Sequence, residues 1–140
     1  MLLLDNSAWS RFWRPRLAKE RYRQIADWLR EQKLGTCLPF LLEAGYSARS
    51  AADHAAIMGD LDLLPHVEIT ANVERLALEA QQNLARVGHH RLRPADILIA
   101  ACAHEAGAGV LHYDKDYDVL REHTRLRFRS EWLAPAGSLD

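Results

Sequence analysis

The chain has 140 residues, a formal net charge of −1 and 49% hydrophobic residues. These values are typical of one soluble globular domain and argue against a globally basic nucleic-acid binder. No apolar stretch approaches the ~20 residues that span a bilayer, and the start lacks the pattern of a signal peptide. Cys37 and Cys102 lie in apolar runs, as reduced core thiols do. We therefore expect a single cytoplasmic domain over residues 1–140, without a membrane segment.

Short apolar runs alternate with helical patterns along the chain. In chain order, we predict a strand over 2–4, helices over 7–13 and 17–33, a strand over 34–39, helices over 40–48 and 50–62, a strand over 66–70, helices over 72–88 and 94–106, and strands over 110–113 and 127–135. This alternation predicts an α/β fold with a mostly parallel sheet of four to five strands. The final residues 135–140 are expected to form a loose tail.

Two carboxylates directly follow apolar runs that are predicted as strands. Asp5 comes after Leu2–Leu4, and Asp114 comes after the run VLHY. In open α/β sheets, sites form outside the carboxyl ends of the strands, near the point where the strand order reverses. If these two strands are neighbours, both carboxylates face one crevice. An isolated Asp at a strand end is otherwise a common solvated turn residue.

Two further acids lie at the starts of helices. Asp96 is in the first turn of a helix that is apolar almost all round, and such a helix is buried. Glu43 follows the second predicted strand and is the only acid between residues 32 and 52. Each has an ordinary alternative role, Asp96 as a helix N-terminal acid and Glu43 as a solvent-facing side chain.

Several carboxylates in one cleft repel one another, and without compensation some would be protonated. Mg²⁺ or Mn²⁺ resolves this conflict, because both favour oxygen ligands and retain water, and such a cation activates water for attack on a phosphodiester. Asp116 either assists the metal or caps the helix that follows it. The run DKDYD does not form an EF-hand loop, because Val119 and Arg125 stand where that loop needs Gly and Glu.

Arginine strongly outnumbers lysine in this chain, with 15 Arg and three Lys. Arg11 follows the first acidic motif closely, and Arg91 and Arg93 precede Asp96. The planar guanidinium group suits bidentate contacts to phosphate, so these three residues are candidate RNA contacts. A solvated basic face is the alternative interpretation.

Taken together, four segments resemble the PIN-domain family, specifically the VapC-type toxins of type II toxin–antitoxin systems. They are LLLDNSAW, FLLEAGYS, RPADILIAACAHEAG and VLHYDKDYD, and they occur in the family's order over nearly the whole chain. The resemblance implies a three-layer α/β/α sandwich and a homodimer. It also implies an Mg²⁺- or Mn²⁺-dependent endoribonuclease toxin, and a cognate, VapB-like antitoxin that occupies the cleft.

Carried over to this sequence, the family's metal-site acids are Asp5, Glu43, Asp96 and Asp114. The chain departs from the family pattern at two places. Asn6 stands where Thr or Ser is frequent, although the hydroxyl of Ser7 is available to orient Asp5. His112 stands where Thr or Ser is common two residues before the last acid, and it either contacts a phosphate or a carboxylate or is a structural histidine.

Two other functions are compatible with a cluster of acids on a parallel sheet. The first is a PIN-like module that binds RNA or an antitoxin without cutting, and metal-dependent RNA cleavage with an EDTA control distinguishes it from the nuclease. The second is a phosphotransfer domain. A dehalogenase-like phosphatase needs an acid at position 7, where Ser7 stands, and a response-regulator receiver needs a different lysine spacing from that of Lys115.

Overall fold

The computed structural model describes residues 1–89 and 91–140. Its elements are β1 (Leu2–Leu4), α1 (Asn6–Trp9), α2 (Lys19–Arg30), β2 (Leu34–Cys37), α3 (Leu38–Tyr46), α4 (Ala51–Leu61), β3 (His66–Val67), α5 (Ala71–Arg86), α6 (Pro94–Ala106), β4 (Gly109–His112), α7 (Asp116–His123) and β5 (Ser130–Trp132). Within the described residues, five strands form one sheet in the order β3-β2-β1-β4-β5. Every pairing is parallel, which confirms the predicted fold class.

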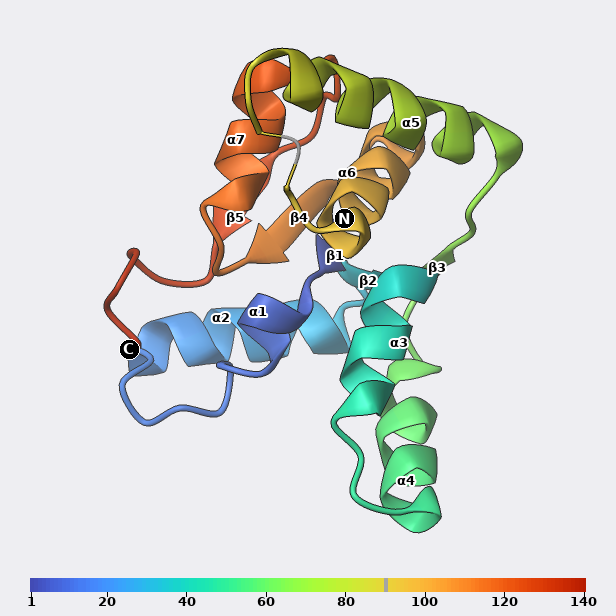
Figure 1. Cartoon of the computed structure of the whole chain (residues 1–140). Coiled ribbons are helices and arrows are strands. Elements are labelled where there is room, and N and C mark those ends of the chain that lie inside the picture. The colour runs from blue at the N-terminus through green and yellow to red at the C-terminus, as the bar shows by residue number, and fades with distance from the viewer. Residues whose placement is uncertain (90) are drawn as a thin grey trace.

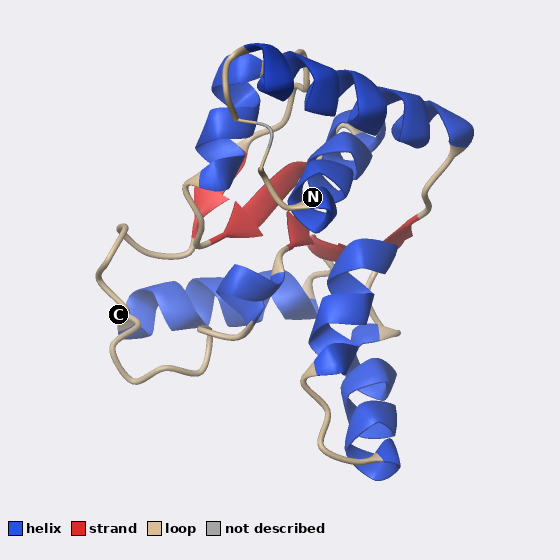
Figure 2. Cartoon of the chain, in the orientation of Figure 1, coloured by secondary structure: helices blue, strands red, loops and turns tan. Residues whose placement is uncertain are grey.

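Helices cover both faces of this sheet (Figures 1 and 2). Strands β1, β2 and β3 advance in one direction across the sheet, and β4 and β5 lie on the other side of β1. Because parallel crossovers are almost always right-handed, the helices before β3 lie on one face and α5, α6 and α7 lie on the opposite face, as Figure 1 shows. The strand order therefore reverses between β1 and β4.

The centre of the sheet is buried on both sides. All three residues of β1 and all four of β4 are buried, as expected for a parallel strand between two helical layers. Helix α6 packs on β1 and β4, and Ile99 and the small side chains of residues 100–103 are fully buried. It begins at Pro94 and ends at Ala106, and the next residue, Gly107, has the left-handed backbone (φ 64°) common after helix ends.

Several element boundaries differ from the sequence-based expectation. Strand β2 ends at Cys37, and Pro39 lies in the first turn of α3, where a missing N–H is not needed for the helix. Helix α1 is only four residues long, whereas we expected a helix over 7–13. Strands β3 and β5 are also shorter than the 66–70 and 127–135 segments, because only part of each segment pairs with a neighbouring strand.

The C-terminal segment is held more firmly than the loose tail we expected. Leu139 is buried, and its backbone N–H donates to the Tyr113 hydroxyl at 3.0 Å. The Arg14 guanidinium donates to the Leu139 carbonyl at 2.9 Å. These contacts attach the end of the chain to the segments that follow β1 and β4. Among the described residues, no helix has both the length and the apolar composition needed to cross a bilayer.

Candidate functional site

The reversal of strand order places two acids at the same edge of the sheet. Leu4, the last residue of β1, pairs with Leu111 of β4. Asp5 therefore leaves β1 beside the end of β4, and its backbone N–H donates to the Leu111 carbonyl at 3.0 Å. Asp114 follows two residues after β4 ends. The crevice expected at the switch point thus receives one carboxylate from each of the two central strands.

Asp5 is almost fully buried and is held by three donors. It caps α1, and its Oδ2 accepts the backbone N–H of Ser7 at 2.9 Å and the Ser7 hydroxyl. Its Oδ1 accepts the Tyr117 hydroxyl at 2.7 Å. The Ser7 hydroxyl in turn accepts the backbone N–H of Tyr113 at 2.9 Å, which ties the Asp5 turn to the end of β4.

Asp96 is fully buried in the first turn of α6 and has few partners. Its Oδ1 lies 3.4 Å from the Tyr117 hydroxyl and 3.5 Å from the Arg93 guanidinium, and its Oδ2 has no hydrogen-bond partner. Burial, followed by the nearby charge of Asp5, raises the pKa of Asp96 from 3.8 to about 7. The site therefore holds a carboxyl group that lacks the partners a buried anion needs.

Glu43 reaches the same crevice from α3. Its Oε2 accepts the Arg93 guanidinium at 3.2 Å, and its Oε1 is buried without a partner. Burial is the main cause that raises the pKa of Glu43, and the charge of Arg93 opposes this shift. Arg93 thus bridges two acids that come from different helices.

Asp114 lies at the other side of Asp96 and is positioned by its own loop. Its Oδ1 accepts the backbone N–H of Asp116 at 2.9 Å, and its backbone N–H donates to His112 Nδ1 at 3.1 Å. Burial raises the pKa of the Asp116 carboxyl, with a further contribution from the charge of Asp114. Asp116 is the first residue of α7, and its carboxylate also faces Asp96.

The acids form two overlapping groups with Asp96 in common. In one group, Asp5, Glu43 and Asp96 each offer a ligand oxygen, and these atoms lie within 4.8 Å of one another. The same holds for Asp96, Asp114 and Asp116. All four expected site acids, and Asp116, are therefore brought together. The unpartnered oxygens of Asp96 and Glu43, together with an all-oxygen donor set, fit a hard divalent cation.

The remaining residues singled out in the sequence occupy different positions. Arg11 donates to the Ser7 carbonyl at 3.0 Å and stacks over the Tyr113 ring at 4.9 Å, so it braces the Asp5 turn. Arg91 is exposed. His112 is fully buried, so its side chain does not reach a substrate phosphate in this conformation.

The buried histidine instead anchors the Asp114 loop. Burial lowers the pKa of His112, which favours the neutral imidazole. Since Nδ1 accepts the Asp114 backbone N–H, the proton lies on Nε2, which is 2.6 Å from the Ser130 hydroxyl. That hydroxyl donates to Asp118 Oδ1 at 2.7 Å. The chain of hydrogen bonds therefore runs from α7 through β5 to the backbone of Asp114.

Tyr117 belongs to the site, although the sequence analysis did not select it. Its hydroxyl contacts both Asp5 and Asp96, and the residue is fully buried. Burial and these two carboxylates raise the pKa of Tyr117 well above 10. The phenol thus remains a hydrogen-bond donor. The sequence signal that could have identified Tyr117 is its position. It stands one residue after Asp116, at the start of the helix that follows the last acidic motif.

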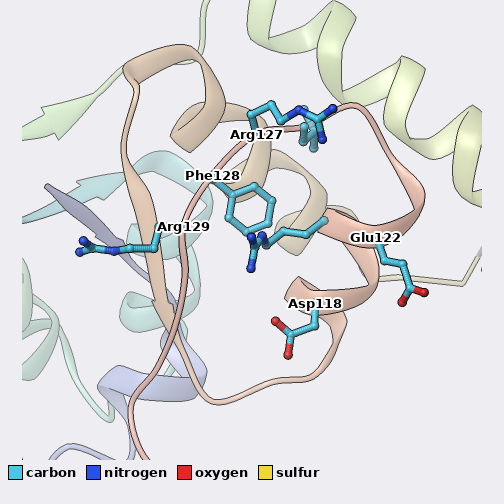
Figure 3. A pocket seen from close by; sticks show the side chains of 7 residues that line it. Asp118, Glu122, Arg127, Phe128 and Arg129 are labelled. Atoms are coloured by element: carbon cyan, nitrogen blue, oxygen red, sulfur yellow. The ribbon is translucent and has the colours of Figure 1, made fainter.

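A surface hollow beside α7 and β5 does not contain these acids. It is lined by Asp118, Arg121, Glu122, Leu126, Arg127, Phe128 and Arg129. Figure 3 shows that the guanidinium groups of Arg127 and Arg129 point away from each other. They therefore do not converge on one anion, and the acid cluster remains the candidate site.

Comparison with known proteins is consistent with this geometry. The family profile of the PIN domain matches residues 2–122. The chain is 37% identical over 139 residues to Ribonuclease VapC18 of Mycobacterium tuberculosis, and the match covers 97% of each protein. It is 38% identical over 99 residues to Ribonuclease VapC51 of the same organism, with 71% of each protein covered.

Solved structures show the same fold at lower sequence identity. A chain from the DNA-bound VapBC complex of Salmonella typhimurium superposes with a TM-score of 0.71 at 21% identity, covering 96% of this chain and all of that chain. A chain from the DNA-bound VapBC2 complex of Rickettsia felis has a TM-score of 0.67 at 15% identity, with 94% and 97% covered.

Proposed function

Because this chain belongs to the PIN-domain family, we propose that it is an endoribonuclease toxin of a type II toxin–antitoxin system, dependent on Mg²⁺ or Mn²⁺. The observation that carries this proposal is the shared position of Asp96, whose oxygens lie within 4.8 Å of both groups of acids. The name Ribonuclease given to relatives at up to 38% identity supports the same activity.

In this proposal, Asp5, Glu43, Asp96 and Asp114 would hold the cation, and Asp116 would assist them. When bound, it would lower the pKa of a coordinated water and offset negative charge at the scissile phosphodiester. Ser7 and Tyr117 fix the orientation of Asp5 by donating to its two oxygens. Hydrolysis by this route leaves a 5′-phosphate and a 3′-hydroxyl.

Glu43 is the acid best placed to accept a proton. It is half-buried on α3, its Oε1 has no hydrogen-bond partner, and burial raises its pKa, which makes it a candidate general base. In this proposal, Arg91 and Arg93, whose side chains are exposed just before α6, contact flanking phosphates. Such phosphate contacts position an RNA without reading its sequence.

An RNA cleavage assay tests the function. We expect the purified protein to cut RNA in the presence of Mn²⁺ and to stop when EDTA is added. Asp96→Asn, which keeps the side-chain shape, should reduce the cleavage rate by more than about 100-fold. Asp60→Asn is the matched control, because Asp60 is exposed on α4 and outside the acid groups, and it should cut as wild type does.

Two results would contradict the nuclease assignment. A folded Asp96→Asn protein that cuts RNA at the wild-type rate would remove Asp96 from the reaction. RNA binding by the wild-type protein without any Mn²⁺-dependent cleavage would favour the alternative, a non-catalytic RNA- or antitoxin-binding module. Circular dichroism of each variant establishes that it is folded.

We further propose that the protein acts in the cytoplasm, where its RNA substrate lies, as a homodimer that a VapB-like antitoxin neutralises. Helix α3 supports a protein partner, because Leu38, Leu42 and Tyr46 are 48%, 64% and 92% exposed and recur every four residues. The same helix carries Glu43. Light scattering of the chain alone, and with the product of a neighbouring gene, tests both partners.

A further inference from the structure

One guanidinium nitrogen lies between two of the proposed metal-binding acids. Arg93 Nη2 is 3.2 Å from Glu43 Oε2 and 3.5 Å from Asp96 Oδ1. Each acid keeps its second oxygen buried and unpartnered. Among the described residues, Arg93 is the only cation whose side chain lies within 4.0 Å of these carboxylates. It therefore stands where a cation that bridges Glu43 and Asp96 would stand.

The backbone of Arg93 is held by the start of α6, whereas its side chain is more than half exposed. Its carbonyl accepts the N–H groups of Asp96 at 3.1 Å and Ile97 at 3.3 Å, and Pro94 follows it. The residue is thus anchored at the start of α6, three positions before Asp96. Its side chain is 58% exposed, so the guanidinium group has open solvent into which it can rotate.

We propose that Arg93 is a built-in counter-ion of the metal-free site, and that a divalent cation binds by displacing its guanidinium group from Glu43 and Asp96 into solvent. This inference rests on the proposed function, because it assumes that the acids bind a metal. It assigns Arg93 a role in metal loading in addition to its candidate contact with RNA phosphate.

The charges at the site explain why a counter-ion is needed and why a divalent cation displaces it. Without a cation, the fully buried Asp96 has Asp5 and Asp114 as negative neighbours. One positive charge at Arg93 reduces this repulsion but leaves two buried oxygens without a partner. A small divalent ion carries twice the charge and approaches several oxygens at once. Arg93 therefore stabilises the empty site and competes with the metal for it.

Measurement of Mn²⁺ affinity tests the competition. The full chain is titrated with Mn²⁺ at pH 8.0, and free Mn²⁺ is followed by electron paramagnetic resonance. We expect Arg93→Gln to bind Mn²⁺ about tenfold more tightly than wild type, because a charge-assisted contact no longer has to be broken. Arg93→Lys keeps the charge without the planar fork and should lie between the two.

Arg91→Gln is the matched control. Arg91 is exposed and lies two residues before Arg93, so this change removes an equal positive charge nearby. Its Mn²⁺ affinity should stay within about twofold of wild type, given the screening of exposed charges. Equal or weaker Mn²⁺ binding by Arg93→Gln overturns the inference while leaving the metal site in place. Absence of Mn²⁺ binding to the wild-type chain overturns both the inference and the proposed metal dependence.

Discussion

Asp96 is the acid that the two groups of carboxylates have in common. Its side chain is fully buried, and the nearest cation, Arg93, reaches only one of its two oxygens. An aspartate in this environment favours its neutral form. The charged form of Asp96 therefore has an electrostatic cost in the metal-free protein, at the position where both acid groups meet. A bound cation would reduce this cost.

We predict that this cost appears in the pH dependence of stability. The pKa of Asp96 in the folded protein is about 7, above its ordinary 3.8. Its protonation therefore stabilises the folded state fully below about pH 4, and this contribution is lost as the pH rises towards 7. Asp96→Asn lacks the charge, so its free energy of unfolding at pH 8 should exceed that of wild type by a few kcal/mol, at about 1.4 kcal/mol per pKa unit.

Chemical denaturation in EDTA at pH 4 and pH 8 measures this difference. The two proteins should have nearly equal free energies of unfolding at pH 4, and the gap should open at pH 8. A gap of the same size at both pH values would show that Asp96 does not titrate between them.

Tyr117 supports the site through its hydroxyl group, and its loss should affect Asp5. We predict that Tyr117→Phe lowers the RNA cleavage rate by about 10- to 100-fold, because Asp5 Oδ1 loses its donor at 2.7 Å. Mn²⁺ affinity should fall together with the rate, and this second readout separates a positioning role from a purely structural one. An unchanged Mn²⁺ affinity would show that the Tyr117 hydroxyl does not position Asp5 for the metal.

At the scale of elements, β1 and the compositionally distinctive α6 could be predicted closely from the sequence, whereas the bounds of several other short elements could not. Helix α6 was evident from its alanine-rich apolar run between Pro94 and Gly107. Strand β3 has only two residues, and α1 only four, because pairing partners and the turn after Asp5 decide where they end. Such boundaries depend on tertiary contacts that the local pattern does not contain.

Strand β4 gives a prediction about packing at this scale. A Cβ atom at Gly109 would lie 2.7 Å from the Arg129 carbonyl oxygen and 2.7 Å from the Leu2 side chain. We predict that Gly109→Ala destabilises the protein by about 1–3 kcal/mol, because the backbone at Arg129 and the buried Leu2 side chain must both move. Thermal unfolding followed by circular dichroism measures the effect.

Gly59 in α4 provides the control, since a Cβ atom there meets nothing within 4 Å. Gly59→Ala should stabilise the helix by up to about 1 kcal/mol. If the two alanine variants shift the unfolding temperature in the same direction, the close approach at β4 does not constrain the sheet.

At the scale of the whole molecule, strand order creates the site. Asp5, Glu43, Asp96 and Asp114 are spread over 110 positions of the sequence, and they meet because β1 and β4 are neighbours at the reversal. The sequence predicted which acids follow strands, and the family resemblance predicted that they converge. The bridging by Arg93 and the contact of Tyr117 with two acids depend on side-chain directions that neither source contains.

The most direct test of the central claim is anomalous diffraction from crystals soaked in Mn²⁺. We predict a Mn²⁺ peak within coordination distance, about 2.0–2.3 Å, of carboxylate oxygens from Asp96 and at least one of Asp5 and Asp114. A map from fully soaked crystals with no peak near Asp96 would contradict the claim that these acids share a cation.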